Sequence, residues 1–252
     1  MVSAFFLLPN PSRLIINRIE SKQAYLRFVA FLSLLTSGRI LSMQSIENNK
    51  PVPNSKRILD LLLTIPGILI LSPILFLISI LVVITYGTPI IFRQKRPGHL
   101  GKPFWVYKFR TMTDARDADN NLLPDSERIT RLGRFLRSYS LDELPELFNV
   151  LRGEMSWVGP RPLLMQYLER YSHEQARRHE VLPGITGWAQ INGRNALTWE
   201  EKFKLDVWYV DHWTLGLDVK ILLITAIKVL RREGINQPGH ATAEEFMGTH
   251  DT

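Results

Sequence analysis

The chain has 252 residues, no cysteine and a formal net charge of +7. The length allows one large domain or two small ones, and the lack of cysteine excludes disulfides and Cys-ligated zinc. The positive charge predicts an anionic partner, which is nucleic acid, anionic lipid or a phosphorylated substrate. Because the sequence has neither a basic stripe nor a motif that reads nucleic acid, we expect no nucleic-acid partner.

Residues 1–55 are predicted to form an N-terminal extension of unknown role. Pro9 and Pro11 interrupt the first apolar stretch and no basic segment precedes it, so the pattern is not that of a signal peptide. The apolar residues 28–35 are too few to cross a bilayer. A surface-lying amphipathic helix and a poorly ordered extension both remain open.

An apolar run extends from Ile58 to Tyr86 and holds one charge, Asp60, in 29 residues. As one helix it would be about 44 Å long, which exceeds the roughly 30 Å hydrocarbon core of a bilayer. Ser72-Pro73 divides the run into two arms, neither of which crosses a bilayer alone. Pro73 is expected to kink the helix. The Ser72 hydroxyl is expected to bond the carbonyl of Ile68 and limit the cost of the break.

The charges that flank the apolar run decide how it meets the membrane. Lys56 and Arg57 precede it, and Arg93, Lys95 and Arg96 follow it. Positive charge marks the cytoplasmic side of a membrane segment, and here both ends carry it. The pattern favours a re-entrant helix, over residues 56–90, that dips into one leaflet and returns. A kinked single span and a buried pair of core helices are the alternatives.

The segment from Trp105 to Met112 is rich in β-branched and aromatic residues and predicts a strand. Alternation puts Lys108 and Arg110 on one face of it. Two cations side by side suit a diphosphate, and the alternative is a basic strand face that touches lipid headgroups. The Asp-rich loop at residues 114–127 is expected to be solvated rather than to hold metal.

Two adjacent carboxylates, Asp142 and Glu143, lie where a helix is expected to begin. Leucine and phenylalanine recur at helical spacing after them, and Pro145 is best tolerated in the first turn, so Asp142 is predicted at or near the N-cap. One reading is purely structural, since Ser140-x-x-Glu143 is also a capping box. In the functional reading, an Asp142 kept ionised by the helix end attacks phosphorus. Asp142 and Glu143 would then share a Mg²⁺ ion, which binds one or two carboxylates plus substrate phosphates.

The turn Pro160-Arg161-Pro162 follows, and its prolines restrict the backbone around Arg161. A pre-aimed guanidinium suits bidentate binding of phosphate. The alternative is a structural salt bridge from Arg161 to Glu143 or Glu154. Arg131, Arg134 and Arg137 recur at helical spacing before the acids, and we expect them to face lipid headgroups.

The segment from Pro183 to Asn195 has too many turn signals for a regular element. Its glycines, Gly184, Gly187 and Gly193, would allow a ligand to approach the backbone, and Trp188 would stack on a base or sugar; a structural loop is the alternative. Amphipathic helices are then expected over residues 203–230. Trp208, Tyr209 and Trp213 are expected there at headgroup level. Residues 231–252 are predicted to be a polar, loosely held tail.

Several sequence blocks, in order along residues 55–230, resemble the bacterial sugar transferases known as monotopic phosphoglycosyl transferases. The blocks are KRILDLLL, SP, FRQKRPG, YKFRTM, LDELPELFNVLRGEMSWVGPRP and PGITGWAQINGRN. The resemblance implies transfer of a sugar-1-phosphate from a UDP-sugar donor to polyprenyl (undecaprenyl) phosphate, with release of UMP. That reaction starts the assembly of an exopolysaccharide, O-antigen or glycoprotein glycan.

The resemblance also implies roles for single residues. Asp142 matches the nucleophile that forms a covalent phosphosugar intermediate, and Glu143 matches its partner, with Mg²⁺ required. Ser72 and Pro73 match the break in a re-entrant membrane helix. The basic positions that engage phosphates are matched by Lys108, Arg110 and Arg161.

The sequence therefore predicts an α+β, membrane-associated fold with one re-entrant helix, amphipathic interfacial helices and a small β element. A catalytic domain over residues 91–230 would face the cytoplasm at the inner (plasma) membrane of a bacterium. One alternative is a non-catalytic membrane scaffold for polysaccharide assembly. Another is a direct sugar transferase that releases UDP. The identity of the sugar and assembly as a homo-oligomer are left open.

Overall fold

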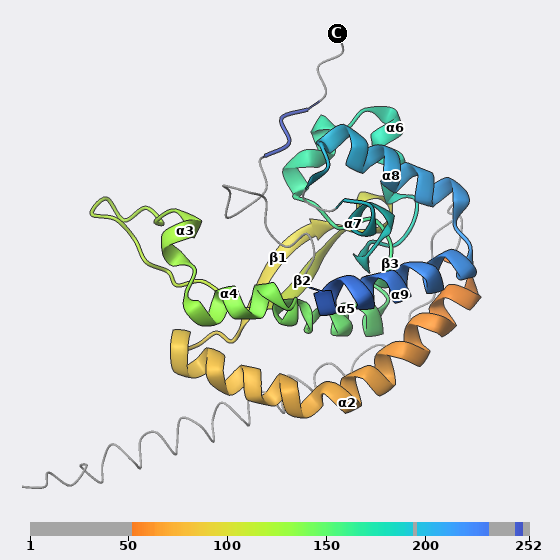
Figure 1. The fold of residues 1–252 in the computed structure, drawn as a ribbon. Helices are drawn as coiled ribbons and strands as arrows, with labels where there is room; N and C mark the ends of the chain where they lie inside the picture. The colour runs from red at the N-terminus through yellow and green to blue at the C-terminus, as the bar shows by residue number, and fades with distance from the viewer. Residues whose placement is uncertain (1–51, 194–195, 232–244, 249–252) are drawn as a thin grey trace, which may run out of the picture. The chain divides into compact units, whose positions relative to one another are not determined.

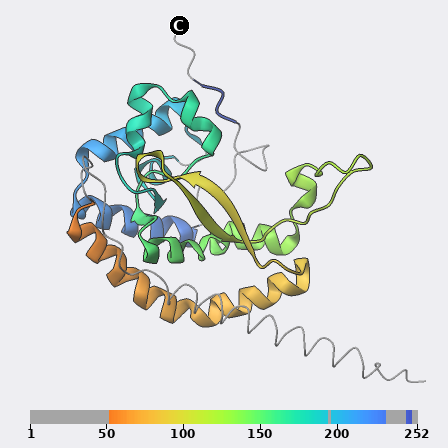
Figure 2. The same cartoon turned by 180° about the vertical axis from the view of Figure 1, so that it is seen from behind.

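The computed structural model describes residues 52–193, 196–231 and 245–248. Nearly all of the predicted N-terminal extension lies outside the described residues. The described chain combines many helices with two small sheets (Figures 1 and 2). The predicted mixture of helices with a small β element is confirmed.

The apolar run forms the long helix α2 (Asn54–Tyr86), which has 33 residues and contains an 18-residue stretch with a mean hydropathy of 3.0. Within the described residues it is the one helix long and apolar enough to cross a membrane. It continues through Pro66 and Pro73, and it curves along its length rather than breaking into two arms (Figures 1 and 2).

The Ser72 hydroxyl compensates for Pro73 in a way that differs from the prediction. It donates to the carbonyl of Leu69 at 2.8 Å, not to that of Ile68. The Leu69 carbonyl is the one that would accept from residue 73 in a regular helix, and proline has no N–H to donate. The hydroxyl therefore replaces the missing donor.

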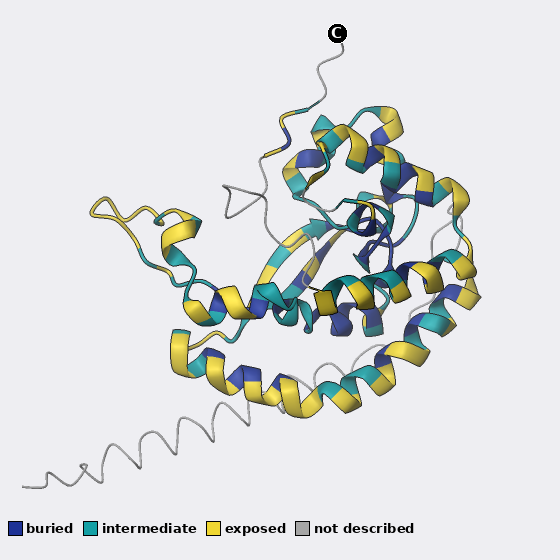
Figure 3. Cartoon of the chain, viewed as in Figure 1, coloured by how far each residue is buried: buried dark blue, intermediate teal, exposed yellow. Residues whose placement is uncertain are grey.

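Both ends of α2 have side chains buried against other described parts of the chain, whereas its middle has none. In the first part Lys56, Asp60 and Thr64 are buried at four-residue spacing. In the second part the buried stripe consists of Leu75, Ile78, Ser79 and Val82. None of residues 65–74 is buried. Figure 3 shows the outer face of α2 largely exposed. The helix is thus held at two places with a bare apolar stretch between them.

The first end of α2 is held by a buried polar cluster. Lys56 Nζ lies 2.6 Å from Asp218 Oδ2, and Asp218 also accepts from the Tyr209 hydroxyl at 2.6 Å and from the indole N–H of Trp213 at 3.0 Å. Tyr209 is 1% exposed, so its predicted place at headgroup level is wrong. It lies on the face of its helix that satisfies the buried ion pair.

Replacing Asp218 with asparagine is expected to lower the free energy of unfolding by about 3–5 kcal/mol, because it leaves the buried Lys56 ammonium without a counter-charge. Thermal unfolding in detergent measures the change. The matched control is Asp211→Asn, which breaks the partly exposed pair of Asp211 with Arg177 and should cost less than about 1 kcal/mol. Equal losses in the two variants would contradict the prediction.

The first sheet is an antiparallel hairpin of β1 (Ile91–Pro97) and β2 (Pro103–Phe109), joined through the short helix η1 (His99–Gly101). Phe104 and Val106 alternate along β2 and are buried in one apolar cluster, and Phe109 at its end is buried in another, which includes residues of α2. The predicted strand extended to Met112, whereas β2 ends at Phe109. This hairpin carries Lys108 toward the acidic pair.

The second sheet is a parallel pair of β3 (Ser156–Val158) and β4 (Gly184–Thr186), and α7 (Trp188–Ile191) follows it. The prediction that this segment forms no regular element is wrong. A Cβ on Gly184 would lie 2.1 Å from Gly159 N, and one on Gly187 would lie 2.2 Å from Gly159 O. These glycines therefore allow two backbone segments to approach each other, rather than a ligand. Trp188 stacks on Trp208, with ring centroids 4.8 Å apart.

Short helices connect these elements, and two longer ones complete the chain. They are α3 (Asp125–Arg128), α4 (Arg131–Ser138), η2 (Leu141–Glu143), α5 (Glu146–Arg152), η3 (Met165–Arg170), α6 (His173–Ala176), η4 (Arg177–His179), α8 (Trp199–His212) and α9 (Leu215–Arg231). The predicted amphipathic segment over residues 203–230 corresponds to α8 and α9.

The described part of the C-terminal tail packs against the domain, whereas residues 231–252 were predicted to be loosely held. Phe246 is 3% exposed and packs against Tyr167, Tyr171 and Phe203. Glu245 beside it pairs with Arg170 at 2.8 Å. Residues 245–248 are therefore anchored to the domain.

Candidate active site

The acidic pair lies in a tight turn between two helices. Asp142 and Glu143 belong to η2, and α5 begins only at Glu146, after Pro145. The predicted N-cap position of Asp142 is therefore wrong by several residues. Ser140 adopts a left-handed conformation with φ 55° and its side chain makes no capping bond, so the capping-box reading is also wrong. The turn leaves both carboxylates free for other partners.

Glu143 is bound by two cations from distant parts of the chain. Lys108 Nζ lies 2.6 Å from Glu143 Oε1, and Arg161 Nη2 contacts the same oxygen. Burial opposes ionisation of this carboxyl, but the charges of Arg161 and Lys108 prevail and hold its pKa far below the ordinary range. The structure thus brings together three of the predicted site residues, and it forms the salt bridge of Arg161 that the sequence left as an alternative.

A third carboxylate, Glu146, was not among the predicted site residues. It is 2% exposed, and its Oε1 lies 3.1 Å from Lys108 Nζ. Burial raises its pKa to about 7, although the charge of Lys108 opposes the shift. The three-residue spacing between Glu143 and Glu146 was a signal for this pairing, since such spacing puts side chains on one face of a helical turn.

The pKa of Glu146 predicts that stability falls as the pH rises. Below about pH 4.5 the carboxyl is protonated in both the folded and the unfolded chain, and between 4.5 and about 7 only the folded chain keeps the proton. Raising the pH from 5 to 8 should therefore cost on the order of 2 kcal/mol of unfolding free energy through this group.

Urea unfolding at both pH values measures this cost. Glu146→Gln, which cannot titrate, should reduce the loss, whereas Glu200→Gln on the exposed face of α8 should leave it as in the native chain. If the Glu146 variant shows the full native loss, the assignment to this carboxyl is wrong.

Asp142 is 8% exposed. Burial and the neighbouring charge of Glu143 raise its pKa, while Lys108, Arg137 and Arg161 oppose the rise. The expectation that a helix end keeps Asp142 ionised is wrong, because η2 is a single turn and α5 begins beyond it. The cations around Asp142, rather than a helix dipole, favour its charged form.

Two further basic residues differ from their predicted places. Arg137 Nε donates to Thr111 Oγ1 at 3.1 Å, and its charge reaches Asp142, whereas it was predicted to face headgroups. Arg110 pairs with Asp114 at 2.5 Å and donates to the backbone carbonyls of Tyr86 and Met112. The side chains of Arg110 and Lys108 therefore bind different partners, and the two do not form a paired phosphate clamp in the structure.

The donor atoms at the acidic pair fit a Mg²⁺ ion bound together with substrate. Among the described residues no group of three or more His, Asp or Glu side chains forms a complete metal site. Glu143 Oε2 has only a long contact of 3.5 Å with Arg161 Nη1 among the bonds of the described residues, and the Asp142 carboxylate is adjacent. Mg²⁺ needs one or two such carboxylates when phosphates and water supply the other ligands.

A comparison with known protein families identifies the chain. A model described as bacterial sugar transferase matches residues 52–232. The chain belongs to the bacterial sugar transferase family. The matched region contains α2, the hairpin, the acidic turn and Arg161, so the expectation that the chain is an enzyme of this family is confirmed.

Curated relatives agree with this membership. A Bacillus subtilis protein named uncharacterized sugar transferase EpsL is 59% identical over 197 residues, which cover 78% of this chain and 97% of that protein. A UDP-glucose:undecaprenyl-phosphate glucose-1-phosphate transferase of Klebsiella pneumoniae is 43% identical, over 69% of this chain and 39% of that protein. An undecaprenyl-phosphate galactose phosphotransferase of Salmonella typhimurium is 38% identical, over 81% and 46%. The chain thus spans less than half the length of these two named transferases.

Proposed function

We propose that this protein transfers a sugar-1-phosphate from a UDP-sugar to a polyprenyl phosphate, such as undecaprenyl phosphate, and releases UMP. The observation that carries the proposal is the acidic turn, where Asp142 lies beside a Glu143 that is clamped by Lys108 and Arg161. The names of the Klebsiella and Salmonella relatives support the donor and acceptor classes. The product would be the first lipid-linked intermediate of an exopolysaccharide, O-antigen or other glycoconjugate.

The proposed mechanism has two displacements at one phosphorus. A carboxylate oxygen of Asp142 attacks the sugar-bearing phosphorus of the donor; the bond from that phosphorus to the bridging oxygen breaks, and UMP leaves with that oxygen. A phosphate oxygen of the polyprenyl phosphate then attacks the same phosphorus, and the aspartyl bond breaks. The lipid diphosphate sugar departs and the Asp142 carboxylate is restored.

The cations of the site would act on the charge that develops in both steps. Glu143 holds Lys108 and Arg161 where their charges act on Asp142, and fixed cations stabilise the charge on a transferring phosphoryl group. Asp142 and Glu143 Oε2 would hold Mg²⁺, which supplies further neutralisation of phosphate charge when bound. Chelation with EDTA should therefore stop UMP release, and added Mg²⁺ should restore it.

The placement of α2 supports the re-entrant geometry, with the domain on the cytoplasmic side of the inner membrane. Near its first end Lys56 pairs with Asp218, and at its last residue the Tyr86 hydroxyl donates to the Thr111 carbonyl at 3.0 Å. Since both ends contact the same domain, a full crossing would pull one set of these contacts through the bilayer. The bare stretch at residues 65–74 would be the part that enters the leaflet.

Single cysteines test this geometry, because the chain has none of its own. Ser55→Cys places an exposed thiol in the first turn of α2, and Thr88→Cys places one just after its last residue. With a membrane-impermeant maleimide on intact spheroplasts, both should stay unlabelled until the membrane is opened. Labelling of one thiol alone in intact spheroplasts would indicate a spanning helix and contradict the proposal.

Product analysis tests the reaction itself. Membranes that contain the protein are given a panel of UDP-sugars with undecaprenyl phosphate, and the released nucleotide is identified. UMP together with a lipid diphosphate sugar is the expected result. Release of UDP would indicate direct sugar transfer, and the absence of both nucleotides with every sugar, beside an active relative, would favour the scaffold reading.

A further inference from the structure

Arg178 is a buried cation that lies outside the acidic turn. It belongs to η4 and is 2% exposed. Its Nε and Nη2 donate to Asp206 Oδ2 at 3.0 and 2.7 Å, and Asp206, on α8, is also 2% exposed. The pair is thus buried away from water. A buried ion pair adds little stability compared with apolar side chains of similar size. Stability alone therefore gives no reason for placing these charges here.

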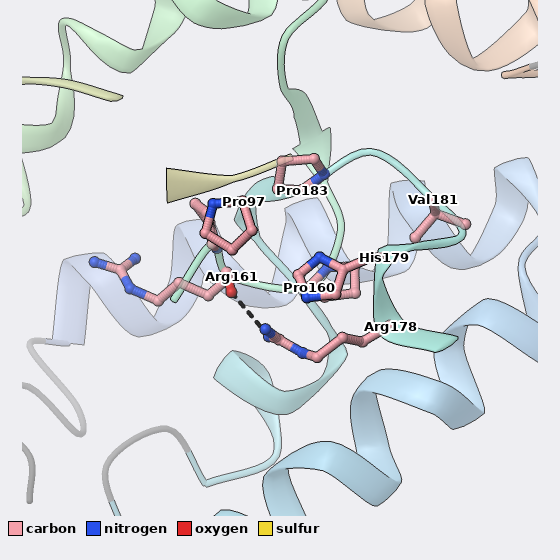
Figure 4. A pocket seen from close by; sticks show the side chains of 8 residues that line it. Pro97, Pro160, Arg161, Arg178, His179, Val181 and Pro183 are labelled. Atoms are coloured by element: carbon pink, nitrogen blue, oxygen red, sulfur yellow. Dashed lines mark hydrogen bonds between the residues drawn. The ribbon is translucent and has the colours of Figure 1, made fainter. Parts of the chain in front are cut away.

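The second contact of Arg178 gives that reason. Its Nη2 also donates to the backbone carbonyl of Arg161 at 2.8 Å. Figure 4 shows the Arg161 carbonyl oxygen facing Arg178 while the Arg161 guanidinium extends in another direction. Arg178 therefore holds the main chain of a residue whose side chain reaches Glu143.

The backbone at Arg161 needs such a partner. Pro160 and Pro162 on either side have no N–H, so the turn lacks two donors that would fix it in regular structure. The Pro160 carbonyl is bound by Gly184 N at 3.1 Å, and the Arg161 carbonyl by Arg178. Together these bonds determine the direction in which the Arg161 side chain leaves the main chain.

Aromatic rings enclose the Arg178–Asp206 pair. The guanidinium carbon of Arg178 lies 5.8 Å from the ring centre of Tyr171 and 5.6 Å from that of Phe203. Phe246 packs on both rings. Exclusion of water strengthens the bond from Arg178 to the Arg161 carbonyl, since bonds in a low dielectric medium are electrostatically stronger.

We propose that Arg178, fixed by Asp206, is a positioning residue that orients Arg161 for phosphate binding. The inference rests on the proposed function of Arg161 in sugar-phosphate transfer. Arg178 itself does not touch the reacting groups. A guanidinium displaced by about 1 Å from its productive place can cost up to about a hundredfold in rate, so loss of this one backbone bond should be visible in kcat.

The first test is Arg178→Lys, which keeps a charge for Asp206 but has no forked donor to reach the Arg161 carbonyl as well. UMP release should slow about tenfold to a hundredfold, mainly in kcat. Arg177→Lys is the matched control, because Arg177 pairs with the partly exposed side chains of Glu174, Glu180 and Asp211; its rate should stay within about twofold. Thermal unfolding shows whether either variant has lost its fold. If Arg178→Lys does not fold, Asp206→Asn, which keeps side-chain volume, replaces it with the same expected loss.

The decisive test combines Arg178→Lys with Arg161→Ala. If Arg178 acts through Arg161, the double variant should release UMP no more slowly than Arg161→Ala alone. A native rate for a folded Arg178→Lys, or a double variant slowed by the product of the two single factors, would overturn the inference and leave the proposed function standing. If Arg161→Ala itself releases UMP at the native rate, the role of Arg161 in the proposed function fails instead.

Discussion

Replacing Asp142 with asparagine is expected to reduce UMP release by at least about 1,000-fold. The amide removes the nucleophilic oxygen anion that would form the aspartyl phosphate. The change is nearly isosteric, so the buried turn should keep its shape and the variant should unfold close to the native temperature. The rate is measured as UMP released from a UDP-sugar in the presence of undecaprenyl phosphate.

Mass spectrometry makes this prediction specific to a covalent step. The native enzyme incubated with donor alone should yield a peptide that contains residue 142 and has gained the mass of the phosphosugar, and the Asp142→Asn peptide should show no gain. Asp119→Asn, in the exposed loop before α3, is the matched control and should keep the native rate and the native adduct. An active Asp142→Asn enzyme, or an active native enzyme without the adduct, would contradict the mechanism.

Replacing Glu143 with glutamine is expected to reduce kcat by about 100-fold. The amide keeps the size of the side chain but removes the charge that holds both Lys108 and Arg161. Without it the two cations repel each other and lose the partner that holds them near Asp142. The same variant should need more Mg²⁺ for half-maximal activity, because one of the two proposed ligands becomes neutral.

The matched control for Glu143→Gln is Glu174→Gln, at an exposed carboxylate that pairs with Arg177. This variant should keep the native kcat and the native Mg²⁺ requirement. A Glu143→Gln enzyme with native kcat and an unchanged requirement for Mg²⁺ would show that the clamped carboxylate is structural. It would leave the role of Asp142 to be judged by its own variant.

The features that the sequence predicted well are those with a local chemical signal. The apolar run is long and holds one charge, so α2 was predictable from composition. The break predicted at Ser72-Pro73 was wrong, since α2 continues through Pro73. The Ser72 hydroxyl was correctly predicted as a donor, but the sequence did not determine that the Leu69 carbonyl accepts its bond. The adjacent acids and the Pro-Arg-Pro turn were recognisable as candidate site residues. A salt bridge from Arg161 was the alternative to phosphate binding, and the structure forms it with Glu143.

The features that the sequence missed depend on which face of an element is buried. Tyr209 belongs to an amphipathic helix, and an aromatic residue with a hydroxyl fits the headgroup region or a buried polar cluster equally well. Gly184 and Gly187 signal a close approach, but a glycine does not indicate whether the approaching group is a ligand or main chain. Glu146 was not predicted as a site residue, because its partner Lys108 comes from the distant hairpin.

At the start of the acidic turn, a local capping pattern competes with long-range ion pairs. Ser140, Asp142 and Glu143 satisfy the sequence pattern of a capped helix, and Pro145 fits the first turn of one. In the structure Glu143 binds two distant cations, and the helix begins after Pro145. Long-range ion pairs outweighed the cap here, and no pattern within a few residues predicts them.

In the proposed topology, the basic residues at the first end of α2 would have two successive roles during biosynthesis. Lys56 and Arg57 are synthesised long before Asp218, which is 162 positions after Lys56, and while they are free their charge opposes passage across the membrane. In the finished protein Lys56 is paired with Asp218, and Arg57 donates to the carbonyls of Val150 and Leu151 at 2.5 and 2.7 Å. The first end of α2 would thus be kept on its side of the membrane by charge during synthesis and by tertiary contacts after folding. The same two side chains would therefore contribute first to membrane topology and then to the stability of the fold.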